Sequence, residues 1–203
     1  MDHDTDPPNP YAETPSFPAR AGRDGLNASD HVFIKNDMMY KHHLARFNYT
    51  TYDVRRGQDV INPNTSHHNV MVLAHADSDG AHDCPFWYAR VLGIYHVNVV
   101  YTGPGMLDYR PRRLEFLWVR WYSNSTVTHG WNECRLDRLQ FPPIAAENAL
   151  EFVDPKFVLR ACHLIPAFAS GKRHVDGIGL SRCAKDSEDW CSYYVMRYVE
   201  SSY

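Results

Sequence analysis

The sequence lacks the features that place a protein in a membrane or outside the cell. No apolar run reaches the roughly 18 residues that a membrane-spanning helix needs. The amino terminus has no basic segment followed by an apolar stretch, so no secretory signal is recognised. The five cysteines are odd in number, and no two have the CxxC spacing of a zinc or redox site. We therefore expect a reducing, intracellular compartment and free thiols.

An excess of positive charge is also missing. The formal net charge is -3 with 12 histidines taken as neutral, so no global field attracts nucleic acid. With 203 residues and 44% hydrophobic content, the chain is able to bury one sizeable core. Aromatic residues make up 13% of the sequence, which favours sheets, where rings pack on a pleated surface.

Signatures of enzymes are absent as well. The sequence contains no Gly-x-Ser-x-Gly, HExxH or P-loop motif. Cys162 and His163 are neighbours, but adjacent side chains of a strand point to opposite faces, which separates a nucleophile from its base. The run GIGLSR at residues 177–182 has too few glycines for a dinucleotide fingerprint. We expect no catalytic residues and no cofactor.

The distribution of prolines divides the chain. Residues 1–30 hold five prolines and almost no aliphatic residues, which predicts a disordered arm. Residues 31–203 are expected to form one mostly β domain with short helical turns. Asp154 followed by Pro155 has the pattern of a helical N-cap and first helical position. Strands are predicted at residues 31–35, 69–74, 86–101, 114–122, 133–141, 159–168 and 190–199, while residues 38–47 fit a helix or a strand.

The segment LEFLWVRWY at residues 114–122 is the clearest strand. Both its even and its odd positions are largely apolar, which predicts burial on both faces. Such a strand is typical of a small barrel or of a sheet covered by loops.

A cluster of metal-binding residue types lies between two predicted strands. It fails the EF-hand pattern, because Tyr88 stands where the bidentate Glu belongs. A solvated turn is the favoured interpretation, and a metal-dependent nuclease or hydrolase remains an alternative. The residues concerned are His75, Asp77, Asp79, His82 and Asp83.

Three arginines precede the clearest strand. Arg110, Arg112 and Arg113 form a local basic excess that is able to contact phosphate. Charged residues also protect sheet edges from aggregation. The first interpretation makes the chain a nucleic-acid-binding accessory domain, and the second gives these arginines a structural role.

Read as a block, the strands resemble a bromo-adjacent homology (BAH) domain. Residues 86–94 (FWYARVLGI) are similar to the family's "ARI" strand, and residues 117–122 (LWVRWY) to its "V-x-W-F/Y" strand. Residues 132–136 (NECRL) are similar to the "N-E-L-F-x-S" segment. Residues 153–162 resemble "I-x-G-K-C-x-V", although Ala161 replaces the usual lysine, and residues 189–198 resemble "F-x-C-R-Y-x-Y".

A second resemblance covers nearly the whole chain after residue 30. It is to the carboxy-terminal segment of uncharacterised proteins of mushroom-forming basidiomycete fungi, associated with transposons of the Plavaka and Kyakuja–Dileera–Zisupton types. The strings that carry it are YTTYDVRRGQDVINPNT, PFWYARVLGIYHVNVVY, LEFLWVRWY, FVDPKFVLRACHLIPAFASGK and DSEDWCSYYVMRYV. This resemblance implies a module of a transposon-derived protein and supplies no function.

The BAH resemblance implies a small β-barrel that binds a histone tail or another partner protein in the nucleus, with no cofactor and no catalysis. Because no apolar run is long enough to span a bilayer, no membrane partner is expected. Aromatic faces are able to surround a methylated ammonium. The positions at which the resemblance places such a cage are Tyr88, Trp118, Trp121 and Tyr122. Packing in the core is the alternative role for each of these rings.

Overall fold

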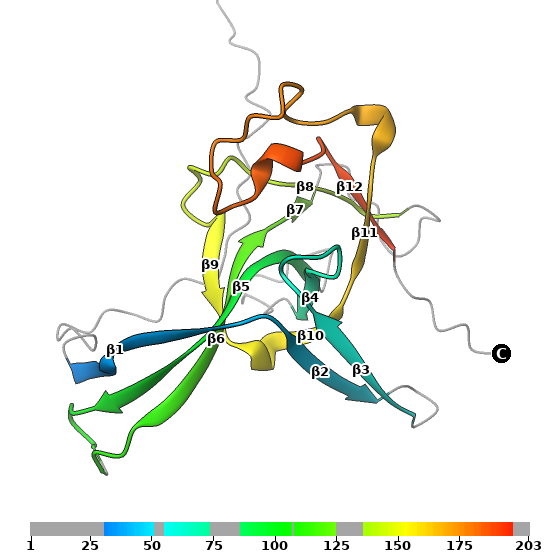
Figure 1. The fold of residues 1–203 in the computed structure, drawn as a ribbon. Coiled ribbons are helices and arrows are strands. Elements are labelled where there is room, and N and C mark those ends of the chain that lie inside the picture. Colours follow the sequence, from blue (N-terminus) through cyan, green and yellow to red (C-terminus); the bar gives the residue numbers. More distant parts are fainter. Residues whose placement is uncertain (1–30, 51–54, 74–85, 107, 125–135, 197–203) are drawn as a thin grey trace, which may run out of the picture.

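The computed structural model describes residues 31–50, 55–73, 86–106, 108–124 and 136–196, and the chain is mostly β (Figure 1). The expected disordered arm, residues 1–30, lies outside the described residues. The described helical segments are three-residue 3-10 turns: η2 (Pro155–Phe157), η3 (Phe168–Ser170) and η4 (Asp186–Glu188). The strands are β1 (Val32–His42), β2 (Ala45–Thr50), β3 (Arg56–Ile61), β4 (Asn69–Leu73), β5 (Phe86–Tyr101), β6 (Arg112–Trp121), β7 (Ser123–Asn124), β8 (Arg138–Gln140), β9 (Leu150–Val153), β10 (Val158–Ala161), β11 (His163–Pro166) and β12 (Tyr193–Met196).

The described strands form three antiparallel sheets. The largest has the order β10-β4-β5-β6-β9, and β1 pairs with the later half of β5. A second has the order β11-β12-β8-β7, and β2 and β3 form a hairpin. No sheet of the described residues closes into a barrel, in contrast to our expectation. At β10, the hairpin is attached through a side chain: Asp59 Oδ2 accepts the Ala161 N–H at 2.8 Å, in place of a continuous backbone ladder.

The core has two parts, one on each face of β5 and β6. Side chains alternate along a strand, so Leu117, Val119 and Trp121 enter the first cluster, and Tyr122 enters the second. Both faces of this half of β6 are buried, as predicted, whereas Leu114 at the other end is half exposed. The second cluster consists of Tyr88, Tyr122, Leu139, Phe141, Leu164, Tyr193 and Val195.

One stretch of extended chain belongs to both larger sheets. Its first part, β10, pairs with β4, and its second part, β11, pairs with β12. The sequence predicted a single strand over residues 159–168, and the break falls at Cys162. The Cys162 N–H donates to the Asn69 carbonyl at 3.0 Å, and Ala167 donates to Ser192 at 2.9 Å.

Three strands extend beyond the core as an arm (Figure 1). It consists of β1 with the adjoining parts of β5 and β6, and nearly all of β1 is exposed. Residues 38–47, which fitted either a helix or a strand, are therefore mainly strand. The helical turn at residue 155 is confirmed, with the Asp154 carboxylate accepting the Lys156 N–H at 3.0 Å. Among the described residues, no helix is long and apolar enough to cross a membrane.

Candidate functional site

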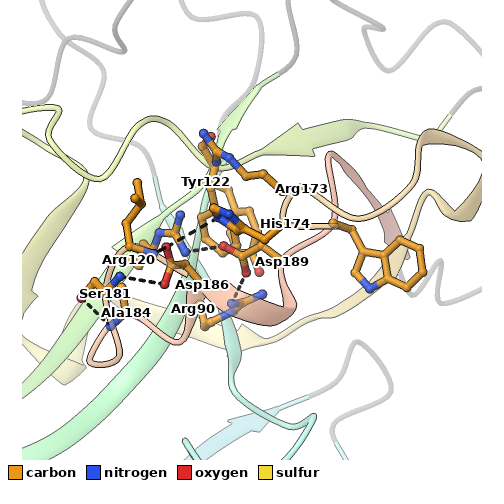
Figure 2. A network of polar contacts seen from close by, with 12 residues as sticks. Arg90, Arg120, Tyr122, Arg173, His174, Ser181, Ala184, Asp186 and Asp189 are labelled. Atoms are coloured by element: carbon orange, nitrogen blue, oxygen red, sulfur yellow. Dashed lines mark hydrogen bonds and ion pairs between the residues drawn. The ribbon is translucent and has the colours of Figure 1, made fainter. Parts of the chain in front are cut away.

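Two buried arginines share one buried aspartate (Figure 2). Arg90 Nη1 donates to Asp189 Oδ1 at 2.6 Å, and Arg120 Nη1 donates to Asp189 Oδ2 at 2.5 Å. Asp189 is fully buried, and the two arginine residues are 8% and 1% exposed. Because an unpaired charge in such surroundings is costly, the aspartate is what allows both guanidinium groups to be inside.

The register of the largest sheet places these arginines. Asn69 on β4, Arg90 on β5 and Arg120 on β6 are directly paired across the three strands. Like charges directly opposite each other destabilise a sheet unless an anion lies between them. Asp189 comes from the segment that links η4 to β12, so the C-terminal loop supplies this anion.

Aromatic rings enclose the ion cluster. The Phe141 ring centroid lies 3.8 Å from the guanidinium carbon of Arg120 and 4.5 Å from that of Arg90. Tyr122 stacks on Phe141 with 4.0 Å between centroids. These cation–π contacts are strong because the groups are desolvated.

Two tyrosine hydroxyls complete the network. Tyr122 donates to Asn69 Oδ1 at 3.1 Å, and the Tyr193 hydroxyl accepts from Arg90 Nη2 at 3.2 Å and from the Trp190 N–H at 3.0 Å. Burial raises the pKa of both phenols, so they stay protonated at neutral pH. Their role in this network is to orient neighbouring groups.

A second buried carboxylate shapes the C-terminal loop. Asp186 accepts the N–H groups of Leu180 at 2.7 Å and Ser181 at 3.0 Å, and His174 Nε2 lies 3.7 Å away. Burial alone would raise the pKa of Asp186, but these backbone N–H groups outweigh it and lower the pKa. The loop is thereby held against the ion cluster, as Figure 2 shows.

An open groove of about 1010 Å³ lies beside this network. Arg90, Tyr122 and Tyr193 contribute to its lining, so the buried network is continuous with an exposed surface. One wall is β11, the turn at residues 63–66 provides another, and the C-terminal loop contributes Gly179, residues 181–182 and residues 185–188. The groove thus brings together segments that are far apart in the sequence.

The β11 wall has one edge that pairs with none of the described strands. The hydrogen bonds of Cys162 and Ala167 point to opposite edges of the strand, toward β4 and β12 respectively. Because backbone groups alternate along a strand, the N–H and C=O of Leu164 face the β4 side. β4 begins at Asn69, whose carbonyl accepts the Cys162 N–H. The pairing with β4 therefore ends at Cys162. Among the described residues, Leu164 therefore has no neighbouring strand on this side.

One end of the groove is electrically positive. The pKa of His68 is lowered to about 4 by burial and by the charges of Arg90 and Lys185. Lys185 Nζ donates to the Pro63 carbonyl at 2.7 Å and to Asn64 Oδ1 at 3.1 Å. Its pKa is also lowered, by burial and by Lys41 and Arg90. At neutral pH His68 is therefore uncharged beside two cations.

The four aromatic residues proposed from the sequence do not surround one opening. Tyr88 and Tyr122 share the second cluster, and Tyr122 lines the groove. Trp121 faces the other side of β6, in the first cluster, and donates its Nε1–H to Glu151 Oε2 at 2.8 Å. Trp118 is half-buried farther along β6, opposite Gly93.

The three arginines proposed from the sequence do not line the groove. Arg110 is exposed, and Arg112 and Arg113 are exposed on the arm, where Arg113 Nε lies 2.8 Å from Glu115 Oε1. The proposed metal ligands His75, Asp77, Asp79, His82 and Asp83 lie outside the described residues. Within the described part of the chain, no group of three His, Cys, Asp or Glu residues is able to hold a metal ion.

The cluster of Arg90, Arg120 and Asp189 was not among the sequence predictions. A signal for it exists: each arginine interrupts an apolar strand, in WYARVLG and LWVRWY. An arginine in a strand buried on both faces requires an acidic partner. That partner is 99 residues from Arg90 and 69 from Arg120, and no local pattern identifies it. Comparison of the chain with family models, with curated proteins and with solved structures finds no match in any of the three.

Proposed function

We propose that this chain is a non-catalytic protein-interaction module that binds an extended segment of a partner protein in the groove. The segment would lie beside β11 and pair with the backbone of Leu164. Adding a strand to an open sheet edge is a common mode of peptide recognition, because main-chain hydrogen bonds supply affinity while side-chain pockets supply specificity. The edge of β11 that pairs with none of the described strands, on a segment that lines the groove, is the observation that carries this proposal.

Exposed apolar side chains near the groove support the same role. Val175, Ile178 and Leu180 are 94%, 70% and 83% exposed in the loop that Asp186 holds in place. Phe168, on the groove wall, is 65% exposed. Large apolar residues gathered at the surface are typical of interaction sites.

The finer proposal is a BAH-like, nuclear chromatin reader within a transposon-derived protein, with a histone tail as its partner. It rests on the sequence resemblance. The accessible rings in the groove are Phe168 and Trp190, which make an edge-to-face contact with 4.9 Å between centroids. A methylated lysine would find ring surface there more readily than at the buried Trp121.

The test is binding of the purified chain to an array of histone-tail peptides and unrelated extended peptides. We expect the chain to bind some of the peptides selectively. Adding such a peptide should protect the Leu164 amide from hydrogen exchange, and the Ser66→Trp variant should no longer bind it. Ser66 is exposed and lines the groove, so a tryptophan there would block it. Ser66→Ala is the matched control. An array without binders, or binding that leaves the Leu164 amide unprotected, would contradict the proposal.

A second candidate function, nucleic-acid binding, is favoured by the exposed arginines at the arm. Binding through Arg110, Arg112 and Arg113 would weaken steeply as salt concentration rises, since phosphate contacts release counterions. The measurement is fluorescence polarisation of labelled DNA at 50 and 200 mM salt, with an Arg110→Gln/Arg112→Gln/Arg113→Gln variant. A salt slope unchanged in the variant would exclude this surface.

A further inference from the structure

The groove lining contains more positively charged than negatively charged side chains. Its cations are Arg90, Arg182 and Lys185, and its acids are Asp186 and Glu188. Asp186 is 1% exposed, and its two oxygens accept the N–H groups of Leu180 and Ser181. The carboxylate oxygens of Asp186 are therefore used in hydrogen bonds within its own loop, and Glu188 is the remaining acid of the lining.

Two of these three cations, Arg182 and Lys185, are not neutralised by ion pairs with described residues, whereas Arg90 is paired with Asp189. Neither Arg182 nor Lys185 has a carboxylate of a described residue within ion-pair distance. Lys185 Nζ has two neutral oxygen partners, Pro63 O and Asn64 Oδ1, which leave one of its three N–H groups available. An ammonium held by neutral acceptors keeps its full charge for a ligand.

Arg90 also has donor capacity left. A guanidinium carries five N–H groups, and Arg90 uses one toward Asp189 and one toward the Tyr193 hydroxyl. Its Nε is buried and has no hydrogen-bond partner. The ion pair with Asp189 and the contact with the Phe141 ring fix the position of the Arg90 guanidinium. Its charge is thus a fixed feature of the groove.

The neighbouring histidine and lysine respond to this charge. The pKa of His68 and the pKa of Lys185 are both lowered by burial and by Arg90, so each group experiences a positive field. A ligand group of negative charge would relieve this repulsion, and a positive one would add to it.

We propose that this basic end of the groove, formed by His68, Arg90, Arg182 and Lys185, binds a carboxylate or phosphate group. The inference rests on the proposed function, in that the group would be a side chain of the extended partner segment: Asp, Glu or a phosphorylated residue. A histone tail bound here would be favoured when it carries a phosphate or an acid at this position. Charge-assisted hydrogen bonds to arginine and lysine are the strong ones in proteins.

The first experiment examines the subsite without a peptide. Inorganic phosphate is titrated into the full chain, labelled with ¹⁵N, and amide shifts are followed. We expect saturable shifts at His68, Asn69 and Lys185 that a double Arg182→Gln/Lys185→Gln variant loses. Lys156→Gln is the matched control, since Lys156 lies on η2 and does not line the groove. Shifts that are unsaturable, or equal in the double variant, would overturn the inference.

The second experiment uses peptides of the form acetyl-Thr-Val-Xaa-Val-Thr-amide, with phosphoserine, Glu, Gln or Lys at Xaa. We expect the phosphoserine and Glu peptides to bind about tenfold more tightly than the Gln peptide, and the Lys peptide to bind most weakly. Comparing the affinities of the phosphoserine and Glu peptides distinguishes a phosphate ligand from a carboxylate.

The two proposals fail differently in these experiments. Equal affinities for all four peptides, with the Leu164 amide protected, would overturn the anion subsite and support the groove. Phosphate shifts at His68 and Lys185, with no peptide bound, would overturn strand addition and support the anion subsite. If neither phosphate nor any peptide binds, both proposals are wrong.

Discussion

The guanidinium carbon of Arg120 lies 3.8 Å from the centre of the Phe141 ring. This contact joins the largest sheet to the segment after β8, and it covers a charge that is almost completely buried. The ring and the Asp189 carboxylate together replace the water that an arginine normally binds. The stability of the domain should therefore depend on both partners.

Replacing Phe141 with leucine should lower the free energy of unfolding by about 2 kcal/mol, because desolvated cation–π contacts and ring packing are lost together. Urea unfolding followed by circular dichroism measures this difference. Phe152→Leu is the control, since Phe152 is 67% exposed on β9 and should cost less than about 0.5 kcal/mol. Equal losses in the two variants would mean that the ring does not stabilise the arginines.

Replacing Asp189 with asparagine should cost about 3–5 kcal/mol, because two guanidinium groups would remain buried without an anion. Glu188→Gln, at the exposed neighbouring position, should change stability little. Adding Arg120→Met to the asparagine variant should restore part of the loss, since one uncompensated charge is removed. A double variant less stable than the single one would contradict the assigned role of Asp189.

Stability should fall on mild acidification because of His68. Its pKa is lowered to about 4 in the folded chain from an ordinary value of 6.5. The unfolded chain therefore binds a proton more tightly than the folded one, so the contribution is complete above pH 6.5 and is lost as pH falls toward 4. Between pH 7 and pH 4.5 we expect a decrease of about 2 kcal/mol.

The control for this effect removes the His68 imidazole. His68→Gln should flatten the dependence of the unfolding free energy on pH in this window, while His67→Gln, at the exposed neighbouring position, should leave it unchanged. Denaturant titrations at pH 7.0, 6.0, 5.0 and 4.5 measure the slopes. An unchanged slope in His68→Gln would assign the acid sensitivity to other groups.

Cys162 should react far more slowly with thiol reagents than Cys183 and Cys191. Burial raises the pKa of its thiol to about 12, and it packs against the second core cluster. At pH 8 its thiolate fraction is about a thousandfold below that of a thiol with a pKa of 9. Cys183 and Cys191 are exposed. After a brief treatment with N-ethylmaleimide, peptide mapping should find these two cysteines modified and Cys162 unmodified. Comparable modification in the native protein would contradict this.

Local patterns in the sequence predicted local structure well. The capped turn at Asp154 and the strands β4, β5 and β6 depend on neighbouring residues, so their patterns are readable. β3 was missed because RGQDVI is largely polar, with Ile61 as its one buried residue. β9 was missed because it has four residues and only Val153 is buried.

Pairing over long distances was harder to predict. The expected barrel requires β10 to meet another strand, but the Asp59 side chain satisfies the Ala161 amide there. The proposed cage residues come from β5, β6 and the residue after β6, yet strand alternation sends Trp121 and Tyr122 to opposite faces. The groove could not be predicted, since its walls come from three separate parts of the chain.

The continuous stretch of chain that forms β10 and β11 couples the unfolding of the two larger sheets. Removing it would take a neighbour from β4 and from β12 at once, so neither of the two larger sheets can melt without disturbing the other. Global unfolding of these sheets is then a single transition, and amides of β10 and β12 should exchange with similar free energies. Whatever pairs with β11 is thereby linked mechanically to β4 and β5, and occupancy of the groove should slow the opening of strands that the ligand never touches.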